Sequence, residues 1–383
     1  MNFTLNDDHI VLRDSAHAFL RKEVDLAPLL VPGAGAAQAP YAELWPKVRE
    51  MGWPGMAVPE AHGGLGMTDI DLALVARECG RFLAPAPLFG AFAGTWALLA
   101  AASESQQARV LPDVAAGASR LALAYLPASG DAEAAASGVQ AAAHADGRHV
   151  LTGTSHYVVD AVGADRFVVA AMLEGQRRLF LADAGEVSVR TRLLEWRDIT
   201  RQVAHVDWDA APAELLPVGW DEAWPGIRNR LFVLLAAESA GGLQAVLDDT
   251  AAYARERVAF GRPIGAYQAI KHGLADMLAQ AECAGTAMLY GAWALSQDDE
   301  TATLAAALAQ SFASEAYRDA THRSIQMFGA IGFTWEMKNH LYFKRARGNA
   351  SLLGAPAAQR ELIAGILERR AGAPSRHTEG DNR

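Results

Sequence analysis

One acidic residue, Glu238, stands inside a long apolar stretch that has the periodicity of a helix. Leu231, Leu235 and Gly242 recur at helical spacing and therefore share one face of that helix. Glu238 lies on the same face, where a carboxylate is unfavourable unless it is paired or neutral. Glu238 is therefore either a core carboxylate that meets an arginine or a backbone donor, or a catalytic base whose pKa is raised by burial.

Two further blocks combine cationic, amide, aromatic and glycine residues at fixed spacing. The first has the pattern Arg-x-x-Phe-Gly-x-Pro-Ile-x-x-x-Gln over residues 257–268. The second reads Gln-Met-Phe-Gly-Ala-Ile-Gly-Phe-Thr-Trp-Glu over residues 326–336, and Gln268 and Gln326 are 58 residues apart. In pattern, order and spacing, the two blocks resemble the two signatures of the acyl-CoA dehydrogenase family.

Composition and charge limit the classes of protein to consider. Apolar residues make up 51% of the 383 residues, enough for two or three domains with a large core, and the net charge of −10 argues against nucleic-acid binding. Two cysteines, Cys79 and Cys283, form no CxxC motif, and no HExxH motif occurs, so we expect no structural or catalytic metal site. The sequence shows neither a signal-peptide pattern nor an uncharged 18-residue segment, so we expect a cytoplasmic protein without a membrane span.

Apolar periodicity divides the chain into three domains and a tail. Residues 1–117 have helical periodicity, and Asn6 is suited to cap the first helix. Residues 118–222 change to alternating apolar runs separated by glycine and aspartate, which predicts an antiparallel β domain. Residues 223–370 return to long helical segments, whereas residues 371–383 are polar and are predicted to be disordered.

The family resemblance covers roughly residues 5–368. It implies a multi-domain α+β fold with an N-terminal helical domain, a middle antiparallel β-barrel and a C-terminal four-helix bundle, and FAD between barrel and bundle. The implied reaction is α,β-dehydrogenation of an acyl-CoA thioester to the trans-2-enoyl thioester. A carboxylate removes the α-proton, the β-hydride goes to the flavin, and an electron-transfer flavoprotein takes the electrons. The resemblance also implies a homotetramer or heterotetramer.

The resemblance assigns cofactor contacts to both signature blocks. Arg257 is expected to reach the FAD pyrophosphate of a neighbouring subunit, because a fixed cation suits a diphosphate. Phe260 is expected to pack on the adenine side, and Gln268 to help hold the cofactor. Gln326 and Gly329 are expected to contact FAD from the second block, where glycine permits close backbone approach.

The β domain departs from the family pattern where the flavin ring is expected. Tyr157 and Val159 belong to a segment that takes the place of a Trp-Ile-Thr-like strand against the flavin. Tyr125 lies near a Thr-Glu-like segment that touches flavin and substrate in the family. Ala330 stands where the family usually has a second glycine. The small residues 239–242 either leave room for a bulky acyl chain or serve close helix packing.

The proton acceptor is missing from both of its family positions. Leu353 stands where most relatives have glutamate, and Ala355 stands where they have threonine. A minority of the family places the base early in the long helix, where this chain has Leu231. Glu238 points the same way as Leu231 but lies about 10 Å further along the helix axis. It is therefore the best candidate for the catalytic base in this sequence.

Three alternatives to a self-sufficient acyl-CoA dehydrogenase stay open. The chain fits one subunit of a heterotetramer in which two related chains share the sites, as the losses at Leu353 and Ala355 suggest. It also fits a flavin monooxygenase or oxidase on the same fold, which needs no glutamate base. A scaffold that has lost its flavin is the third alternative, and the retained Arg257 and Gln326 argue against it.

Overall fold

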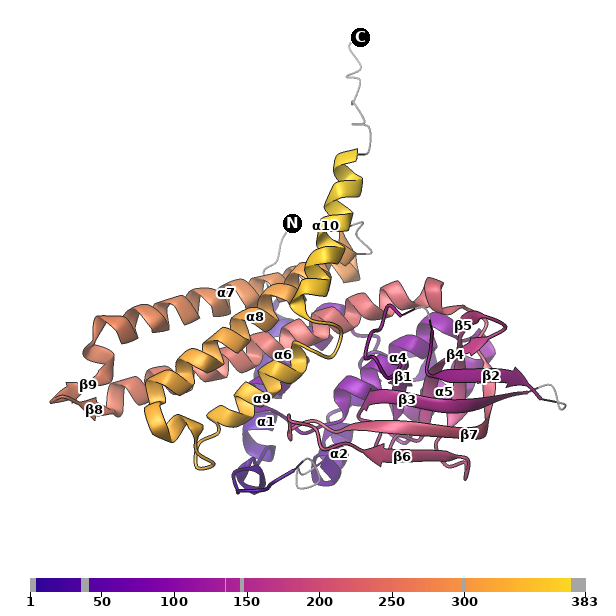
Figure 1. Cartoon of the computed structure of the whole chain (residues 1–383), viewed down its shortest axis with the longest axis horizontal. Coiled ribbons are helices and arrows are strands. Elements are labelled where there is room, and N and C mark those ends of the chain that lie inside the picture. Colours follow the sequence, from indigo (N-terminus) through magenta and orange to yellow (C-terminus); the bar gives the residue numbers. More distant parts are fainter. Residues whose placement is uncertain (1–4, 36–40, 135, 145–147, 298–300, 373–383) are drawn as a thin grey trace, which may run out of the picture.

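The computed structural model describes residues 5–35, 41–134, 136–144, 148–297 and 301–372. Helices come first, a β barrel follows, and long helices complete the chain (Figure 1). This arrangement confirms the predicted fold class. The N-terminal helices are α1 (Asp7–Glu23), α2 (Tyr41–Glu50), α3 (Asp69–Phe82), α4 (Leu88–Ala101) and α5 (Glu104–Ala115).

Capping residues fix where three of these helices begin. The side chains of Asn6, Thr68 and Ser103 each accept a hydrogen bond from the backbone N–H three residues later. The third residue of each helix bonds back to the cap in turn, so each cap forms a capping box. The prediction that Asn6 caps the first helix is confirmed.

Seven strands form the barrel sheet of the middle region. β4, β2, β3, β7 and β5 are neighbours in that order, and a further β4–β5 pairing closes these five into a ring; β1 pairs with β4 and β6 with β7 outside it. Two pairs, β1–β4 and β2–β4, are parallel, so the barrel is mixed rather than wholly antiparallel. The strands are β1 (Leu121–Ala124), β2 (Val139–Ala143), β3 (His149–Val159), β4 (Arg166–Leu173), β5 (Gln176–Asp183), β6 (Val189–Leu193) and β7 (Val203–Leu215).

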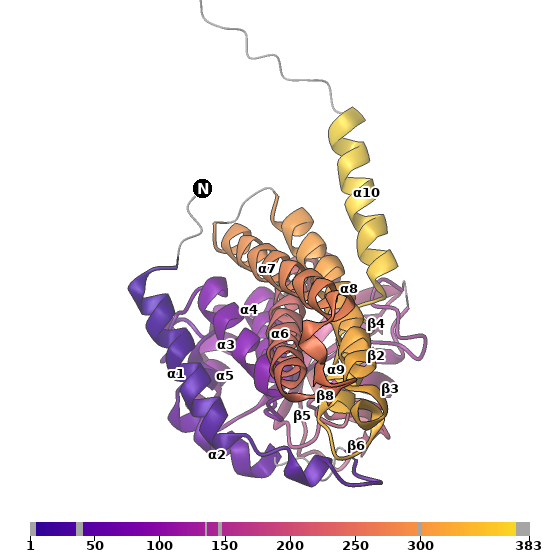
Figure 2. The ribbon, with the colours of Figure 1, turned by 90° about the vertical axis from the view of Figure 1, so that its left-hand side faces the viewer.

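Long helices form the C-terminal part, and a small hairpin lies between the first two of them. Figure 1 places that hairpin at the end of the molecule opposite the barrel, and Figure 2 shows α10 standing out from the helices around it. The elements are α6 (Trp220–Glu256), β8 (Val258–Ala259), β9 (Arg262–Pro263), α7 (Gln268–Ser296), α8 (Ala302–Phe328), α9 (Asn339–Asn349) and α10 (Pro356–Gly372).

The predicted domain divisions stay predictions, although the elements lie close to them. Helix α5 ends at Ala115 and α6 begins at Trp220, three residues before the predicted division. Helix α10 extends to Gly372, so the first residues of the predicted disordered tail are helical. The rest of that tail, residues 373–383, lies outside the described residues.

Helix α6 runs through the centre of the protein and is long and apolar enough to cross a membrane. However, 89% of its apolar window is buried inside the protein, which is the environment of a core helix. Small residues let α3 pack closely against it. A Cβ on Gly80 would lie 2.0 Å from the carbonyl oxygen of Glu238, and one on Gly241 would lie 1.8 Å from that of Arg77. The small residues of this segment therefore serve helix packing.

Candidate functional site

A narrow cavity of about 10 Å³ lies where the barrel meets α4 and α6, with room for about one water molecule. The structure brings Tyr125, Tyr157 and Val159 together at this cavity, and their contact with flavin stays a prediction. Leu231, one of the two family positions for the base, lies in the same wall. The wall consists of Phe89, Gly90, Ala93, Leu123, Tyr125, Leu126, Tyr157, Val159, Leu231 and Leu352.

Tyr157 occupies a strained backbone position beside the cavity. Its φ of 52° is in the left-handed region, and the register between β3 and β7 shifts between Ser155 and Val158. The ring centroid lies 5.6 Å from that of His205 and 6.3 Å from that of Trp196. Strained backbone of this kind gathers at ligand sites, so the bulge supports a binding role for this end of β3.

Among the described residues that line the cavity, none has an acidic side chain. Leu353, the other family position for the base, is buried, and its carbonyl oxygen accepts a hydrogen bond of 2.9 Å from Gln359 Nε2. Both family positions for the proton acceptor are thus held by leucines that belong to the apolar core. These lining residues exclude water but offer no group that could take a proton.

Glu238 lies away from this wall, in a buried ion pair with Arg201. Arg345 Nη1 lies 3.7 Å from the same carboxylate oxygen. Two guanidinium groups therefore lie against this carboxylate. The geometry therefore favours the first interpretation, a core carboxylate that meets an arginine. The assignment of Glu238 as the catalytic base stays a prediction.

A groove of about 740 Å³ opens beside the cavity at the start of α6. Trp220 and Trp224 are stacked in its wall with ring centroids 4.5 Å apart, and Trp224 lies 5.0 Å from Tyr125 of the cavity. The guanidinium of Arg177 lies 3.9 Å from the Trp220 ring, and burial lowers the pKa of Arg177 to about 10. Arg228 also lines the groove and is paired with Glu133 at 3.0 Å, so the groove carries both signs of charge, and the rings of Trp220 and Trp224 are buried in its wall.

Sequence analysis missed this groove. One signal was available, because Trp220, Trp224 and Arg228 recur every four residues at the start of a helix and so share one face. The partner from the barrel, Arg177, gives no comparable signal, since it stands in an alternating strand more than 40 residues earlier. Its place in the groove depends on how the barrel closes.

The signature residues of the helical domain lie at the other end of the molecule. Arg257, Phe260, Gln268, Gln326 and Gly329 are all exposed at the hairpin end of α6, α7 and α8. Phe260 is 96% exposed and has a φ of 53°, an unfavourable backbone conformation for an aromatic residue. A strained and almost fully exposed aromatic side chain indicates a contact outside the chain.

One chain cannot bring the two groups of predicted cofactor residues to the same ligand. Leu231 at the cavity and Arg257 at the hairpin are separated by most of α6, roughly 40 Å at about 1.5 Å per residue. That span exceeds the length of a dinucleotide cofactor. Tyr157 and Val159 could share such a cofactor with Arg257 and Phe260 only if the two pairs belonged to different chains. The expectation that Arg257 serves a neighbouring subunit stays a prediction.

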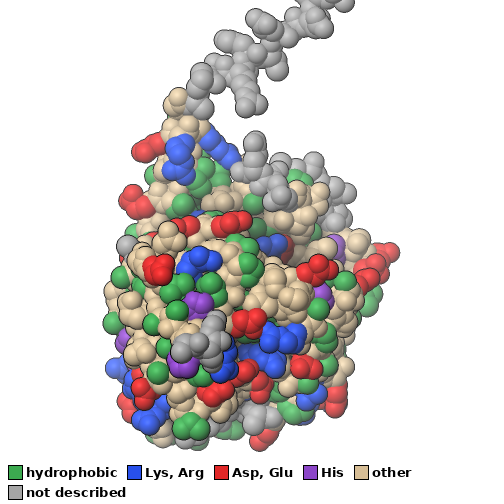
Figure 3. Space-filling model, turned by 90° about the vertical axis from the view of Figure 1, so that its right-hand side faces the viewer, with side chains coloured by type: hydrophobic (Ala, Val, Ile, Leu, Met, Phe, Trp, Pro, Cys, Tyr) green, Lys and Arg blue, Asp and Glu red, His purple; other side chains and the backbone are tan. Residues whose placement is uncertain are grey.

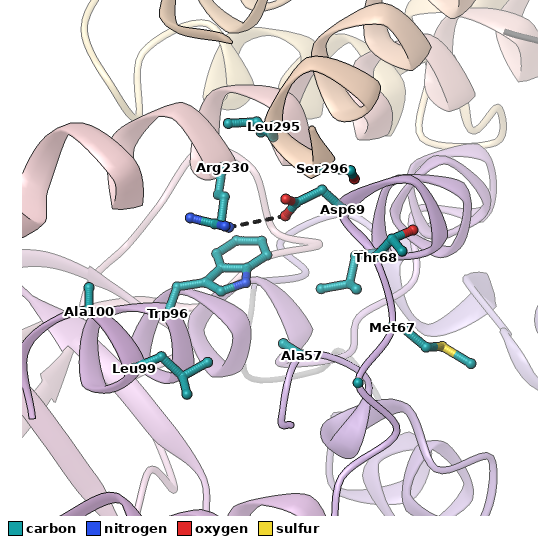
Figure 4. Close-up of a pocket in the computed structure, with 12 residues that line it drawn as sticks. Ala57, Met67, Thr68, Asp69, Trp96, Leu99, Ala100, Arg230, Leu295 and Ser296 are labelled. Carbon is teal, nitrogen blue, oxygen red and sulfur yellow. Dashed lines mark hydrogen bonds and ion pairs between the residues drawn. The ribbon is translucent and has the colours of Figure 1, made fainter. Parts of the chain in front are cut away.

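A third cavity, of about 490 Å³, contains none of the predicted residues (Figure 4). Asp69 at the start of α3 and Arg230 of α6 form an ion pair across it, with Asp69 Oδ1 3.1 Å from Arg230 Nε. Trp96 of α4 covers the side below this pair. Burial raises the pKa of Asp69, and Arg230 partly offsets that rise. This cavity lies beside α3 and the end of α7, apart from the barrel.

Charged side chains of both signs lie on the barrel end of the molecule. Acidic and basic side chains are interspersed on that face, with histidines among them (Figure 3). His156 and His205 form an edge-on pair with ring centroids 4.6 Å apart, and burial lowers the pKa of both. Among the described residues, no group of three or more His, Cys, Asp or Glu side chains is arranged to hold a metal ion.

Comparison with known proteins identifies the class of this fold and site. The chain belongs to the acyl-CoA dehydrogenase family: the model of the N-terminal domain matches residues 6–118, and that of the C-terminal domain matches residues 229–367. It is similar to acyl-CoA dehydrogenase IpdE2 of Mycobacterium tuberculosis, with 33% identity over 91% of this chain and 94% of the relative.

Two solved structures of similar sequence share the whole fold. A variant of the Tcur3481-Tcur3483 steroid ACAD has a TM-score of 0.84 and 28% identity, covering 96% of this chain and 99% of that one. The ChsE4-ChsE5 complex from Mycobacterium tuberculosis has a TM-score of 0.84 and 26% identity, covering 98% of this chain and 100% of that one. Members of the family bind FAD and are oxidoreductases that act on CH–CH donors.

Proposed function

We propose that this chain takes part in FAD-dependent α,β-dehydrogenation of an acyl-CoA thioester as one subunit of a mixed assembly. In that assembly a second, related chain supplies the proton acceptor. The observation that carries the proposal is the cavity wall: Leu231 lies in it, Leu353 is buried next to it, and none of the described lining residues is a carboxylate that replaces them. Because leucine cannot accept a proton, this cavity cannot by itself remove the α-proton of a thioester.

A groove that carries both signs of charge adjoins the cavity: Arg178 and Arg228 line it together with Glu133, Asp221 and Glu222. Arg228 is paired with Glu133 at 3.0 Å, and the rings of Trp220 and Trp224 are buried. Tyr125 joins groove and cavity through its contact with Trp224, so an acyl thioester lying in the groove would point its reactive end toward the cavity. The apolar wall then keeps water from the thioester.

FAD fits residues at both ends of the molecule. Bound between subunits, it would supply the acceptor for the hydride that leaves the β-carbon. Tyr157 and Val159 of one chain would hold the ring end, where the strained bulge of β3 presents them to the cavity. Arg257 and Phe260 of a neighbouring chain would hold the diphosphate and adenine end, because they are exposed and stand clear of their own chain.

Two relatives support an assembly of unlike chains. The ChsE4-ChsE5 complex and the Tcur3481-Tcur3483 enzyme are each named as a pair of proteins. The second is also named a steroid ACAD, which favours a bulky, ring-bearing acyl group for this chain. We further propose that an electron-transfer flavoprotein takes the electrons from the assembly.

The test is the amount of FAD per chain, measured from the flavin absorbance of the purified protein together with the mass of the oligomer. The mixed assembly predicts less than one FAD per chain when this chain is produced alone. Co-production with the second chain should restore FAD binding and thioester oxidation. One FAD per chain in a homotetramer that oxidises an acyl-CoA would overturn the proposal, and Glu238→Gln would then test Glu238 as the base.

A further inference from the structure

Four charged side chains are buried together behind the cavity. Asp198 and Arg201 belong to the connection between β6 and β7, Glu238 to α6, and Arg345 to α9. Their exposed fractions run from 1% for Asp198 to 6% for Glu238. They form a continuous array, which we call the ionic clasp, in the order Asp198–Arg345–Glu238–Arg201.

Arg345 is the centre of the ionic clasp and is among the largest fully buried side chains of the protein. Its Nε donates to Asp198 Oδ2 at 2.6 Å. Its Nη2 donates to the carbonyl oxygen of Thr200 at 2.9 Å and to the Thr200 hydroxyl at 2.7 Å. This use of the planar guanidinium fork fixes α9 against the β6–β7 connection in one orientation.

The ionic clasp is connected to three walls of the cavity. Gly348 follows Arg345 and packs on Asp198, and the same turn continues into Leu352 of the wall. Next to Arg201, the carbonyl oxygen of Gln202 accepts a hydrogen bond of 2.9 Å from the N–H of Asp160, the residue after Val159 of β3.

Asp160 also connects the ionic clasp to the third wall of the cavity, which α4 forms. Its Oδ2 accepts a hydrogen bond of 2.9 Å from the N–H of Gly90, which lines the cavity on α4. The guanidinium of Arg201 also lies 4.8 Å from the ring of Phe89, the neighbour of Gly90. The positions of α4, β3 and residues 348–353 around the cavity are therefore tied to one buried array.

Stability alone does not account for this arrangement. Buried ion pairs lose their hydration, and apolar residues of similar volume often give an equal or more stable core. What the array provides is direction, because each guanidinium fork donates to its partners in few geometries.

We infer that Asp198, Arg201, Glu238 and Arg345 are positioning residues that hold residues 348–353 and the end of β3 in register around the cavity. The inference rests on the proposed function only in taking this cavity as the place where the thioester reacts. Glu238 then acts through Arg201 and Arg345 rather than by accepting a proton from substrate.

Amide hydrogen exchange in the full-length chain tests the inference without any need for turnover. Glu238→Gln leaves Arg201 without its counter-charge, so both the unfolding midpoint and the protection of residues 196–202 and 348–353 should fall. Arg201→Met combined with Glu238→Met removes both charges. The double variant should recover the unfolding midpoint, while exchange in residues 348–353 stays at least about tenfold faster than in the unchanged chain.

A conservative variant and a surface control complete the test. Arg345→Lys keeps the charge but loses the fork, so exchange in residues 348–353 should again accelerate. If Glu238→Gln does not fold, Arg345→Lys and the double variant together still test the inference. Asp276→Asn breaks the exposed pair with Arg323 and should change nothing at the cavity. If the double variant and Arg345→Lys both show the exchange of the unchanged chain, the ionic clasp only stabilises the fold and the inference is wrong.

Discussion

The two ends of α6 have opposite characters. At the hairpin end, residues of both family signatures are kept, and Arg257, Phe260 and Gln326 are exposed. At the barrel end, the family positions for the proton acceptor are leucines: Leu231 lines the cavity of about 10 Å³, and Leu353 follows Leu352 of its wall. The exposed cationic, amide and aromatic side chains of the family pattern are present at the hairpin end. At the barrel end, leucine replaces the acidic side chain of that pattern.

This difference shows which functions a chain can lose within an assembly. An exposed arginine beside a strained turn adds little to the stability of its own chain, which fits the proposal that a neighbouring chain uses it. A buried glutamate, by contrast, destabilises the core unless it is paired or neutral. Where another chain performs proton abstraction, leucine is the more stable choice at residue 353.

The largest effect is expected from restoring the acid at the cavity. Leu353→Glu would bury a carboxyl group in an apolar core, lowering the free energy of unfolding by about 3 kcal/mol at neutral pH. Burial would raise the pKa of the new carboxyl group, so the loss should be smaller at pH 5 than at pH 8 in urea unfolding.

Leu353→Gln is the matched control, since it has nearly the same shape without an ionisable group, and its loss should not depend on pH. Under the proposed function, Leu353→Glu produced alone should not oxidise acyl-CoA. Thioester oxidation by a homotetramer of Leu353→Glu would show that the chain lacks only the base. The difference between the two ends of α6 would then come from a single residue.

A smaller effect is expected from removing the cation at the hairpin. Arg257→Ala should weaken FAD binding by the assembly by about 2 kcal/mol, roughly thirtyfold, because a charge-assisted contact to a diphosphate is lost. The unfolding midpoint of the chain should stay unchanged, since Arg257 is exposed. Equilibrium dialysis of FAD measures the affinity.

Arg255→Ala serves as the control for that experiment, because Arg255 is also exposed and lies in the last turn of α6. Equal losses of FAD in the two variants would mean that the hairpin end contributes only general positive charge. A loss confined to Arg257→Ala would locate the diphosphate at this residue.

A still smaller effect is expected for Asp160, which belongs to the cavity end. Burial raises its pKa from 3.8 to about 6, against the opposing effects of Arg201, the Gly90 N–H and Arg120, while Glu238 adds to the rise. A raised pKa means that the folded chain binds the extra proton. The resulting stabilisation is fully present below pH 3.8 and is lost as the pH rises through 6.

Asp160→Asn should therefore remove a pH dependence. The unchanged chain should lose roughly 1 kcal/mol of this contribution between pH 5 and pH 7.5, and the variant should not. Asparagine keeps an oxygen that accepts from Gly90, so the hydrogen bond survives. Unfolding curves at the two pH values measure the difference, and an identical slope in both proteins would show that Asp160 stays ionised.

Periodicity and motif spacing predicted much of this molecule. The helix that carries Glu238 and the strands of the middle domain follow from local pattern, because helix and strand periods depend on neighbouring residues. The closure of the strands into a barrel was implied by the family resemblance. The absence of the base at Leu353 depends on residue identity at one position of the family pattern and stays a prediction.

The partners of buried charges could not be predicted in the same way. Arg201 and Glu238 are 37 residues apart, and Asp198 and Arg345 are 147 apart, so nothing local joins them. Their pairing depends on how the barrel docks on α6 and α9. The groove has the same origin, because Arg177 reaches Trp220 only after β5 takes its place in the closed barrel.

The smallest effect on stability, and the sharpest test of the contrast between the two ends, is expected at Phe260. Its φ of 53° favours asparagine or glycine over phenylalanine, so Phe260→Asn should raise the free energy of unfolding by about 0.5 kcal/mol. The same change removes a side chain that is 96% exposed, so FAD retention by the assembly should fall. If Phe260→Asn is more stable but its assembly retains less FAD, the strained turn at Phe260 serves cofactor binding by a neighbouring chain. If FAD retention is unchanged, the hairpin end has no role in cofactor binding, and the exposed aromatic ring then needs another partner.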